Sequence, residues 1–363
     1  MASKTAVIAG ATGIVGRGLI DHLRSTGEWN IVSVSRRESD LGSGVRHVRA
    51  DLLDKDASAR QLGELREATH IFYTAYAPRP SWAEEVWPNV SMLVNLVEAL
   101  EGVAPNLAHV QLMQGTKWYG NHLGPFSTPA RETDPRHLPP NFYYDQQDWL
   151  VERQRGKRWS WSALRPHCIM GFALGSPMSH LMGLSLYSVI SRELGLPLRW
   201  PGDPAAFASM YNFTDARLLG RAMAWAATTQ ACENEAFNMT NGDVDRWERV
   251  WPEVAEIFGM EAGRKVQQVN LQRMMADKEP LWARMREKYG LQAFELKQLV
   301  SWPWADWAYS TPYDQVSSIA KARRAGWTAV QDTGTMFREL IGGLVDNRII
   351  PPAPVPAGSM RAS

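Results

Sequence analysis

A glycine-rich turn near the start of the chain constrains its fold more than any other stretch. Residues 4–9 are mostly small or apolar, and Gly10, Gly13 and Gly16 follow in a G-x-x-G-x-x-G pattern. Beyond the turn, apolar residues recur at helical spacing as far as Leu23. A buried strand, a tight turn and an amphipathic helix, in this order, predict the opening unit of a dinucleotide-binding α/β fold.

Each of the three positions in this turn requires glycine for a physical reason. A pyrophosphate is bound by bare backbone N–H groups at the positive end of a helix, where a Cβ atom would collide with it. We therefore expect Gly10 to make the turn, Gly13 to let the backbone approach the phosphates, and Gly16 to let the helix pack on the strand. This spacing is typical of short-chain and extended short-chain dehydrogenases rather than of G-x-G-x-x-G enzymes.

Strand and helix signals alternate through the first half of the chain. This alternation predicts a Rossmann doubly wound parallel sheet. The further strands are expected at residues 30–35, 45–52, 69–76, 108–114 and 161–172, and helices at 89–101 and 142–155. Between them, residues 118–140 form a proline-containing loop that is long enough to cover a site.

The second half of the chain predicts a mainly helical substrate lobe, rich in tryptophan. Residues 1–172, completed by segments around 205–245, are expected to form the dinucleotide-binding Rossmann domain. Residues 173–204 and 245–350 are expected to form the lobe, in which aromatic core packing is the default role of each tryptophan. The tail at 351–363 is rich in Pro and Ala, so disorder is expected there.

Composition excludes several classes of function. The 39 basic and 38 acidic residues nearly cancel, which argues against nucleic acid or an anionic membrane as the main partner. Cys168 and Cys232 lack C-x-x-C spacing and are expected to be buried, reduced thiols. With no export signal or spanning segment evident, a soluble cytoplasmic protein is expected. The eight histidines show no H-x-x-x-H or H-E-x-x-H pairing, so no metal site is expected.

The ends of the second and third strands carry residues suited to the adenosine half of a cofactor. Arg36 and Arg37 follow the second strand, where arginine accommodates the 2′-phosphate of NADP and an acid binds the 2′-hydroxyl of NAD. The two arginines favour NADPH, although Glu38 follows at once. Asp51, after the third strand, is a second candidate because extended dehydrogenases commonly place an Asp there, facing the adenine amino group.

The catalytic signature of ordinary short-chain dehydrogenases is incomplete in this chain. Those enzymes carry Tyr-x-x-x-Lys on the helix after the fifth strand, and the lysine lowers the tyrosine pKa. Here Tyr143 and Tyr144 are followed four residues later by Gln147 and Asp148, so the lysine is missing. A lysine, Lys117, stands instead at the end of the fifth strand, where the usual enzymes keep a serine.

At these positions the sequence resembles the progesterone 5β-reductase and iridoid synthase-like (PRISE) family of atypical extended short-chain dehydrogenases/reductases. The family's marks are Gly-x-Lys-His-Tyr, Gly-Pro-Phe and Asn-Phe-Tyr-Tyr-x-x-Glu-Asp. This chain has Gly-Thr-Lys-Trp-Tyr at 115–119, Gly-Pro-Phe at 124–126 and Asn-Phe-Tyr-Tyr-Asp-Gln-Gln-Asp at 141–148. Further matches are the glycine turn, the arginine pair and residues 236–247, so the resemblance extends to about residue 345.

The resemblance implies an NADPH-dependent ene reductase. The family adds hydride in a 1,4 sense to the C=C bond of activated enones and enals, and negative charge develops on the carbonyl oxygen as an enolate. Carried over residue by residue, Tyr143 donates to this oxygen and Lys117 helps to orient and polarise the contact. The substrate implied is a small apolar enone, such as a steroid, a monoterpenoid or a cyclic enone, and homodimerisation is common in the family.

The resemblance and the fold together imply the remaining site residues. The substrate is expected to contact Tyr76, Phe126, Tyr143 and Met170. The cofactor is expected to contact Gly10, Thr12, Gly13, Ile14, Val15, Gly16, Ser35, Arg36, Arg37, Asp51, Leu52, Thr74, Ala75, Tyr76, Gln114, Tyr143, Pro166 and Ile169. The chain departs from the family pattern where Trp118 replaces His and Gln147 replaces Glu, which alters the rim or helix wall of the pocket.

Two other functions stay open at this level. A carbonyl reductase or alcohol dehydrogenase would deliver the hydride to the carbonyl carbon, using the same cofactor. A non-catalytic NADP(H)-binding sensor would keep the fold without turnover, although such proteins commonly lose the tyrosine that this chain retains. A sugar epimerase of the extended class is disfavoured by the missing Tyr-x-x-x-Lys.

Overall fold

The computed structural model of the chain describes residues 4–37, 41–263 and 268–354. The backbone divides into two compact units. The first, here called the Rossmann unit, consists of residues 1–169, 214–242 and 316–330. The second, here called the helical unit, consists of residues 170–213, 243–315 and 331–363. Most of the tail predicted to be disordered, from residue 355 onward, lies outside the described residues.

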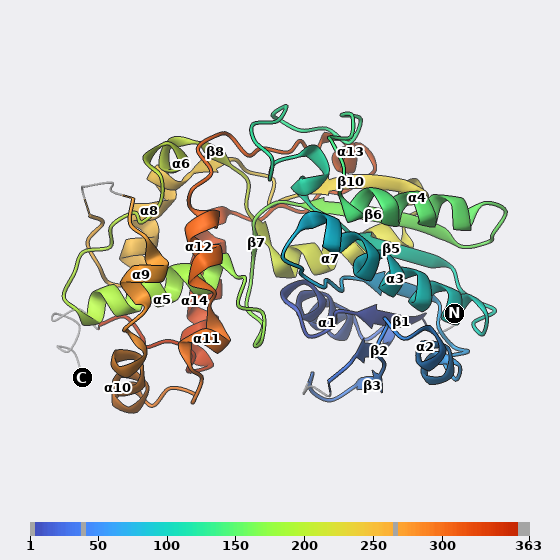
Figure 1. Cartoon of the computed structure of the whole chain (residues 1–363), viewed down its shortest axis with the longest axis horizontal. Coiled ribbons are helices and arrows are strands. Elements are labelled where there is room, and N and C mark those ends of the chain that lie inside the picture. The colour runs from blue at the N-terminus through green and yellow to red at the C-terminus, as the bar shows by residue number, and fades with distance from the viewer. Residues whose placement is uncertain (1–3, 38–40, 264–267, 355–363) are drawn as a thin grey trace. The chain divides into compact units, whose positions relative to one another are not determined.

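A parallel sheet of seven strands forms the centre of the Rossmann unit, in the order β10-β6-β5-β4-β1-β2-β3 (Figure 1). Strand β1 pairs with both β2 and β4, so the strand order reverses beside it. Ligands of such sheets bind at this reversal, outside the carboxyl ends of the strands. The strands are β1 Lys4–Ala9, β2 Trp29–Ser35, β3 Val45–Arg49, β4 His70–Tyr73, β5 His109–Met113, β6 Ser160–Pro166 and β10 Glu235–Met239.

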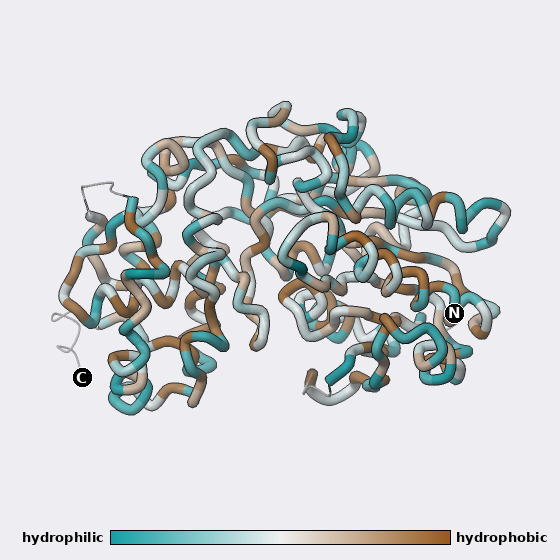
Figure 2. The backbone as a smooth tube through the Cα atoms, viewed as in Figure 1, coloured by the Kyte–Doolittle hydropathy of each residue, from teal (hydrophilic) through white to brown (hydrophobic). Residues whose placement is uncertain are grey.

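Helices cover both faces of this sheet, because alternate residues of each strand point to opposite sides. Val7 and Ala9 of β1 join the apolar cluster that includes α3, whose apolar residues appear as brown segments in Figure 2. Ala6 and Ile8 join the cluster that includes α1 and α7. The helical elements of this unit are α1 Ile14–Thr26, α2 Lys55–Leu62, α3 Trp82–Glu101, η1 Thr116–Tyr119, α4 Phe142–Gln154, α7 Ala216–Thr228, η2 Gln230–Cys232 and α13 Ala320–Arg324, with the short strand β9 Thr214–Asp215.

The helical unit is built around aromatic side chains. Trp200 lies 5.3 Å from Trp247 and 5.0 Å from Trp251 between ring centroids, and all three are almost fully buried. This confirms aromatic core packing as the role of these tryptophans. The elements are α5 His180–Glu193, α6 Pro204–Ala208, β8 Met210–Tyr211, β11 Asp245–Arg246, α8 Trp247–Ile257, α9 Leu271–Met275, α10 Glu279–Tyr289, α11 Leu296–Leu299, α12 Trp302–Ala308 and α14 Thr333–Asp346. Strand β7, Ile169–Met170, falls at the boundary of the two units.

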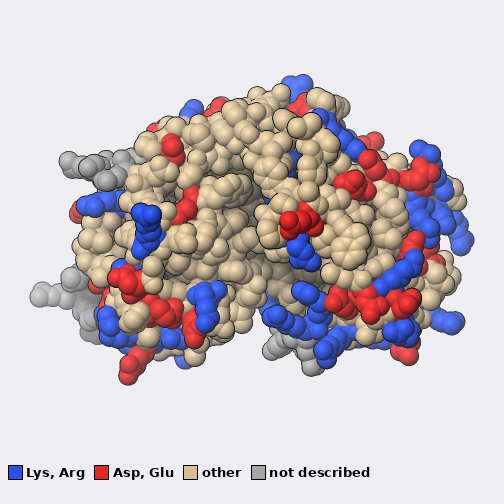
Figure 3. Space-filling view, in the orientation of Figure 1, with Lys and Arg blue, Asp and Glu red and all other residues tan. Residues whose placement is uncertain are grey.

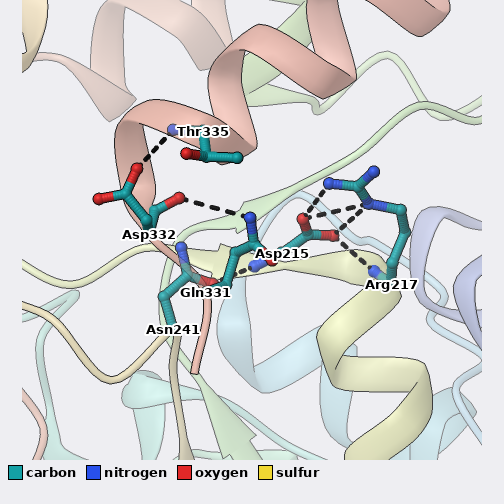
Figure 4. Close-up of polar contacts among 6 residues, drawn as sticks. All are labelled: Asp215, Arg217, Asn241, Gln331, Asp332 and Thr335. Carbon is teal, nitrogen blue, oxygen red and sulfur yellow. Dashed lines mark hydrogen bonds and ion pairs between the residues drawn. The ribbon is translucent and has the colours of Figure 1, made fainter. Parts of the chain in front are cut away.

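Side-chain caps fix where two of these helices begin (Figure 4). In the Rossmann unit, Asp215 accepts the backbone N–H of Arg217 at 2.7 Å and pairs with the Arg217 guanidinium. The amide oxygen of Asn241 accepts the backbone N–H of Asp215 at 2.7 Å. In the helical unit, Asp332 accepts the backbone N–H of Thr335 at 2.7 Å, which starts α14. Such caps satisfy donors that the first helical turn leaves open.

The predicted α/β class with a parallel sheet is confirmed, and the differences lie at element boundaries and in the division of the chain. Residues 316–330, expected in the lobe, belong to the Rossmann unit, and residues 205–213, expected in the Rossmann domain, belong to the helical unit. Helix α3 begins at Trp82 rather than near residue 89, because Ser81 caps it by accepting the N–H of Glu84. The 3₁₀ turn η1, which includes Lys117, extends to Tyr119 and so occupies the first residues of the loop expected from residue 118. Strand β10 carries no clear strand pattern in the sequence and is held by parallel pairing to β6.

The surface charges, the two cysteines and the apolarity of the helices bear on the expectations drawn from composition. Basic and acidic side chains are interspersed over the face drawn in Figure 3. Cys168 and Cys232 are buried and form no disulfide, as expected. Among the described helices, none is both long and apolar enough to cross a bilayer.

Candidate active site

The glycine turn packs directly against the end of β4. Gly10 has φ +82°, a left-handed conformation that other residues rarely adopt. A Cβ atom at Gly10 would lie 2.6 Å from the carbonyl carbon of Thr74 and 2.7 Å from the backbone nitrogen of Ala75. At Gly16 it would lie 2.4 Å from the carbonyl oxygen of Gly10. The structure therefore brings the predicted cofactor residues of this turn and of the segment after β4 together.

The N-terminus of α1 is open for a ligand. Gly13 is its N-cap residue and, having no side chain, supplies no capping acceptor to the backbone N–H groups that follow in Ile14 and Val15. The positive end of the helix dipole lies at the same place. Thr12 contributes its carbonyl oxygen to the Arg17 guanidinium at 3.4 Å. This arrangement fits a pyrophosphate group.

The residues predicted to contact the adenosine half lie at the ends of β2 and β3. Arg36 and Arg37 are both exposed, and the Ser35 hydroxyl donates to the carbonyl oxygen of Arg37 at 2.6 Å. Glu38 lies outside the described residues. The exposed Asp51 accepts the backbone N–H of Leu53 at 3.1 Å through one carboxylate oxygen. Leu52 is buried, and its carbonyl oxygen accepts from the Asn95 amide at 2.8 Å.

Tyr143 and Lys117 come from different elements that one side chain joins. Tyr143 lies in the first turn of α4, and Lys117 lies in η1, directly after β5. Asn141, which is 6% exposed, accepts the backbone N–H of Tyr143 at 3.1 Å and donates to the carbonyl oxygen of Lys117 at 2.8 Å. The amide of Asn141 therefore sets the separation between the two predicted catalytic residues.

The hydroxyl of Tyr143 is available for a ligand. A Cβ atom at Gly115 would lie 3.5 Å from this hydroxyl and 3.6 Å from the carbonyl oxygen of Pro166, so the phenol lies against the end of the sheet. Burial raises the pKa of Tyr143 well above its usual value, and the charge of Glu85 adds to this. The phenol is therefore protonated at neutral pH and acts as a hydrogen-bond donor.

The hydroxyl groups of the neighbouring tyrosines, unlike that of Tyr143, donate hydrogen bonds within the protein. The hydroxyl of Tyr144 donates to the carbonyl oxygen of Trp118 at 2.6 Å, and that of Tyr119 donates to Asn238 at 2.6 Å. The hydroxyl of Tyr76 donates to the carboxylate of Glu85. Within the described residues, the hydroxyl of Tyr143 and the ammonium group of Lys117 make no hydrogen bond or ion pair.

The buried Arg165 connects the segment after β5, the turn η1 and helix α4 through its guanidinium group. The Arg165 guanidinium donates to Gln114 at 2.9 Å, to the Tyr119 hydroxyl at 3.2 Å and to Gln147 at 3.2 Å. It also lies 3.6 Å from the ring centroid of Trp118. Gln114 in turn donates to the carbonyl oxygen of Tyr143 at 3.3 Å. The side chain of Gln114, a predicted cofactor contact, is thus already used to connect the end of β5 with α4.

Three of the predicted substrate residues lie in the Rossmann unit, and the fourth, Met170, lies in the helical unit. In the Rossmann unit, Phe126 and Tyr143 pack against one apolar cluster, which contains Trp118, Tyr119, Ala130 and Tyr144. Tyr76 is 41% exposed, and its ring stacks with Phe142 at a centroid distance of 5.7 Å. Met170 is buried and belongs to the helical unit. Ile169, a predicted cofactor residue, is partly buried in the Rossmann unit.

Sequence reasoning did not select Asn141, Arg165 or Glu85. Asn141 carried a usable signal, because an asparagine directly before a helical pattern is a preferred N-cap residue. Arg165 is a charged residue within the otherwise uncharged strand β6, which also marks it as unusual. Trp118, expected at the rim of the pocket, is instead 4% exposed, because the Arg165 guanidinium stacks on its ring.

Comparison with known proteins shows the family. The family model described as the PRISE-like Rossmann-fold domain matches residues 45–335. The chain belongs to this family. A 3-oxo-Δ4,5-steroid 5β-reductase of Arabidopsis thaliana is 32% identical, over 96% of this chain and 93% of the relative. An (S)-8-oxocitronellyl enol synthase of Nepeta cataria is 32% identical over the same shares.

A short-chain dehydrogenase of Penicillium aethiopicum is also similar, with 30% identity over 92% of this chain and 96% of the relative. These relatives make this PRISE-like chain an oxidoreductase, as the sequence predicted. The UDP-glucose 4-epimerase of Thermus thermophilus, solved in complex with NAD, has a TM-score of 0.66 and covers 95% of this chain and 99% of its own. Its sequence identity of 18% shows a common fold alone.

Proposed function

We propose that this PRISE-like protein is an NADPH-dependent ene reductase, which adds hydride to the β-carbon of an activated enone or enal. The observation that supports the proposal best is the phenol of Tyr143, which is protonated and has no partner among the described residues. Asn141 links the backbone of Tyr143 to that of Lys117, whose ammonium group also has no ion pair among those residues. The relatives named as a steroid 5β-reductase and an oxocitronellyl enol synthase favour the same chemistry.

The chemistry needs a donor rather than a base. As hydride reaches the β-carbon, the C=C electrons shift toward the carbonyl, and negative charge develops on its oxygen. A donor aimed at this oxygen in a desolvated site stabilises the transition state more than the ground state. The raised pKa of Tyr143 keeps the phenol protonated, so that it can donate. The enolate then takes up a proton from solvent at the α-carbon, which completes the reduction.

Lys117 acts on the same oxygen by charge. Its ammonium group forms no ion pair within the described residues, so no carboxylate neutralises it by direct contact. A cation near a developing oxyanion lowers its energy, most strongly where water is excluded. Asn141 holds the backbone of Lys117 relative to that of Tyr143, so both groups approach one substrate oxygen in a fixed geometry.

The residues at the glycine turn fit the phosphates of NADPH, which supplies the hydride when it is bound. The open N-terminus of α1 would hold the pyrophosphate through backbone N–H groups. The exposed Arg36 and Arg37 would hold the 2′-phosphate. We expect replacement of both arginines by alanine to raise the KM for NADPH by about a hundredfold and to leave that for NADH nearly unchanged.

The deciding experiment is turnover of cyclohexenone by wild type, Tyr143→Phe and Lys117→Ala. NADPH consumption gives the rate, and mass spectrometry identifies the product. We expect cyclohexanone from wild type and a loss of about a hundredfold or more in kcat for Tyr143→Phe. Tyr144→Phe is the control for folding, because that neighbouring hydroxyl points to Trp118.

The other outcomes assign different functions. Cyclohexenol as the product would make the protein a carbonyl reductase. NADPH binding without turnover of any enone or enal in a panel would make it a cofactor-binding sensor, and the family membership would then mark ancestry. Equal rates for Tyr143→Phe and wild type would remove Tyr143 from the mechanism.

A further inference from the structure

A buried carboxylate lies beside the proposed site and, apart from its effect on the pKa of Tyr143, has no role in the chemistry described so far. Glu85, in the first turn of α3, is 5% exposed. Carboxylates are rarely buried to this degree unless a hydrogen bond or a cation satisfies them. The hydroxyl of Tyr76 satisfies Glu85 by donating to its Oε1 atom. The two residues form a unit, here called the Tyr76–Glu85 pair.

This pair adjoins both proposed catalytic residues. The ammonium nitrogen of Lys117 lies 6.0 Å from the ring centroid of Tyr76. The Tyr76 ring stacks on Phe142 with an interplanar angle of 22°, and Phe142 meets the Tyr143 ring edge-on at a centroid distance of 4.5 Å. Tyr76 thus has the carboxylate at its hydroxyl end, while Lys117 and the aromatic wall of the site lie around its ring.

The charges around this pair are few. Lys117 brings a positive charge that no direct ion pair cancels within the described residues. His122 lies near it, but burial and the Lys117 charge lower the pKa of His122 to about 4, so this ring is neutral at pH 7. The negative charge of Glu85 reaches Tyr143, where it raises the pKa of the phenol. A site with Lys117 alone would attract anions, and Glu85 offsets this attraction.

We propose that Glu85 is a specificity-determining residue, held by Tyr76, whose carboxylate makes the site reject enones that carry a negative charge. The inference rests on the proposed function, because it concerns the substrates of the same site. The selectivity is electrostatic. A substrate carboxylate would meet the repulsion of Glu85 in a partly desolvated site, whereas a neutral enone would not.

The test compares two substrates with the same carbon chain and ketone, one of which carries a negative charge at C1. These are methyl (E)-4-oxopent-2-enoate, which is neutral, and (E)-4-oxopent-2-enoate, which is an anion at pH 7. The measured quantity is the ratio of kcat/KM for the anion to kcat/KM for the ester. Differences in intrinsic reactivity cancel when this ratio is compared between variants.

We expect Glu85→Gln to raise the ratio about tenfold over wild type, which corresponds to about 1.4 kcal/mol. Glu85→Met, which removes the charge and keeps a similar volume, is expected to shift the ratio in the same direction. Glu84→Gln is the matched control, because Glu84 is the preceding residue of α3 and is exposed to solvent. Its ratio should equal that of wild type.

The outcomes separate this inference from the proposed function. If the ester is reduced but the ratio is the same in wild type and in whichever Glu85 variant folds, Glu85 does not select substrates by charge. A merely structural role would lower kcat/KM for both substrates alike, and this result too would overturn the inference. If wild type reduces neither the ester nor cyclohexenone, the proposed function itself fails.

Discussion

At the scale of single residues, the site depends on amides that connect backbone segments. The Asn141 side chain uses its oxygen for the N–H of Tyr143 and its nitrogen for the carbonyl of Lys117. Gln114 joins Arg165 to the carbonyl of Tyr143 in a similar way. Neutral amides can do this because each carries both donors and an acceptor. They position charged and phenolic groups without competing for a substrate oxygen.

Asn141 allows helix capping to be separated from positioning. Asn141→Asp keeps an N-cap acceptor but loses the donor to Lys117. Asn141→Ser keeps the acceptor and replaces the amide donor with a hydroxyl on a shorter side chain, whereas Asn141→Ala loses both. We expect the alanine variant to lower the free energy of unfolding by about 1 kcal/mol, and the serine and aspartate variants to lower it much less. All three should lose roughly tenfold in kcat, because Lys117 is no longer held relative to Tyr143.

Urea denaturation and enone turnover measure these two effects separately. Tight binding of NADPH by each variant is the control that the cofactor site is intact. If the serine and aspartate variants turned over at the wild-type rate, the bond to Lys117 would have no positioning role.

At the scale of elements, the Rossmann unit depends on one unusually close helix pair. Helices α1 and α7 meet at Gly18 and Gly220. A Cβ atom at Gly220 would lie 2.3 Å from the carbonyl oxygen of Gly18, and one at Gly18 would lie 2.2 Å from that of Ala216. Both contacts involve backbone atoms, which cannot rotate away. The packing of α1, which presents its N-terminus to the cofactor, therefore requires glycine at this contact.

Two glycines in helix interiors give opposite predictions. Gly220→Ala should lower the free energy of unfolding by about 1–3 kcal/mol, because the added methyl group overpacks the contact with α1. Gly342→Ala, in α14, should raise it by about 0.5–1 kcal/mol, because the added Cβ would meet no atom within 4 Å beyond the adjoining residues and the backbone of its own helix, and alanine favours helix. Denaturation midpoints measured at one protein concentration give both values. A stabilised Gly220→Ala would show that α1 and α7 are not packed this closely.

At the scale of the whole molecule, buried neutral histidines occur in both units. His70 and His109 are direct neighbours on β4 and β5, and burial lowers their pKa values to about 4 and about 3. His180 begins α5 in the helical unit, where burial lowers its pKa to about 3. Each ring has an ordinary pKa near 6.5 once the chain unfolds. The whole protein is therefore expected to be sensitive to mild acid.

The sign of this effect follows from proton binding. Between pH 6.5 and about 4, the unfolded chain protonates these three rings and the folded chain does not. Acidification therefore favours unfolding, at up to about 1.4 kcal/mol per pH unit for each ring. The stability that these rings provide is complete above pH 6.5 and is lost as the pH falls toward the folded-state values.

Urea unfolding measured from pH 7.5 to pH 4.5 checks this prediction. His109→Gln should reduce the slope of stability against pH, because one linked proton is removed. An identical slope in wild type and His109→Gln would show that His109 does not contribute.

The parallel sheet and the identity of the family could be predicted from the sequence. The glycine spacing, the apolar run into Gly10 and the helical period after Gly16 are patterns within one contiguous segment, so they can be read without knowing the packing that requires them, such as the contact of Gly10 with Thr74. The motifs around Lys117 and Tyr143 are also contiguous segments, so the family could be recognised from them, as the match to the PRISE-like domain confirms. Helix and strand limits were less accurate, because capping by Ser81 and pairing of β10 depend on particular bonds.

Only the tertiary structure decided which polar groups near the site are engaged and which are free. Tyr76, Tyr119, Tyr143 and Tyr144 are the same residue type in sequence, yet their hydroxyl groups have different partners or none among the described residues. The same holds for Glu84 and Glu85, of which one is exposed and the other buried. Local patterns reflect neighbours along the chain, whereas desolvation and hydrogen bonding depend on groups that folding brings together from distant segments.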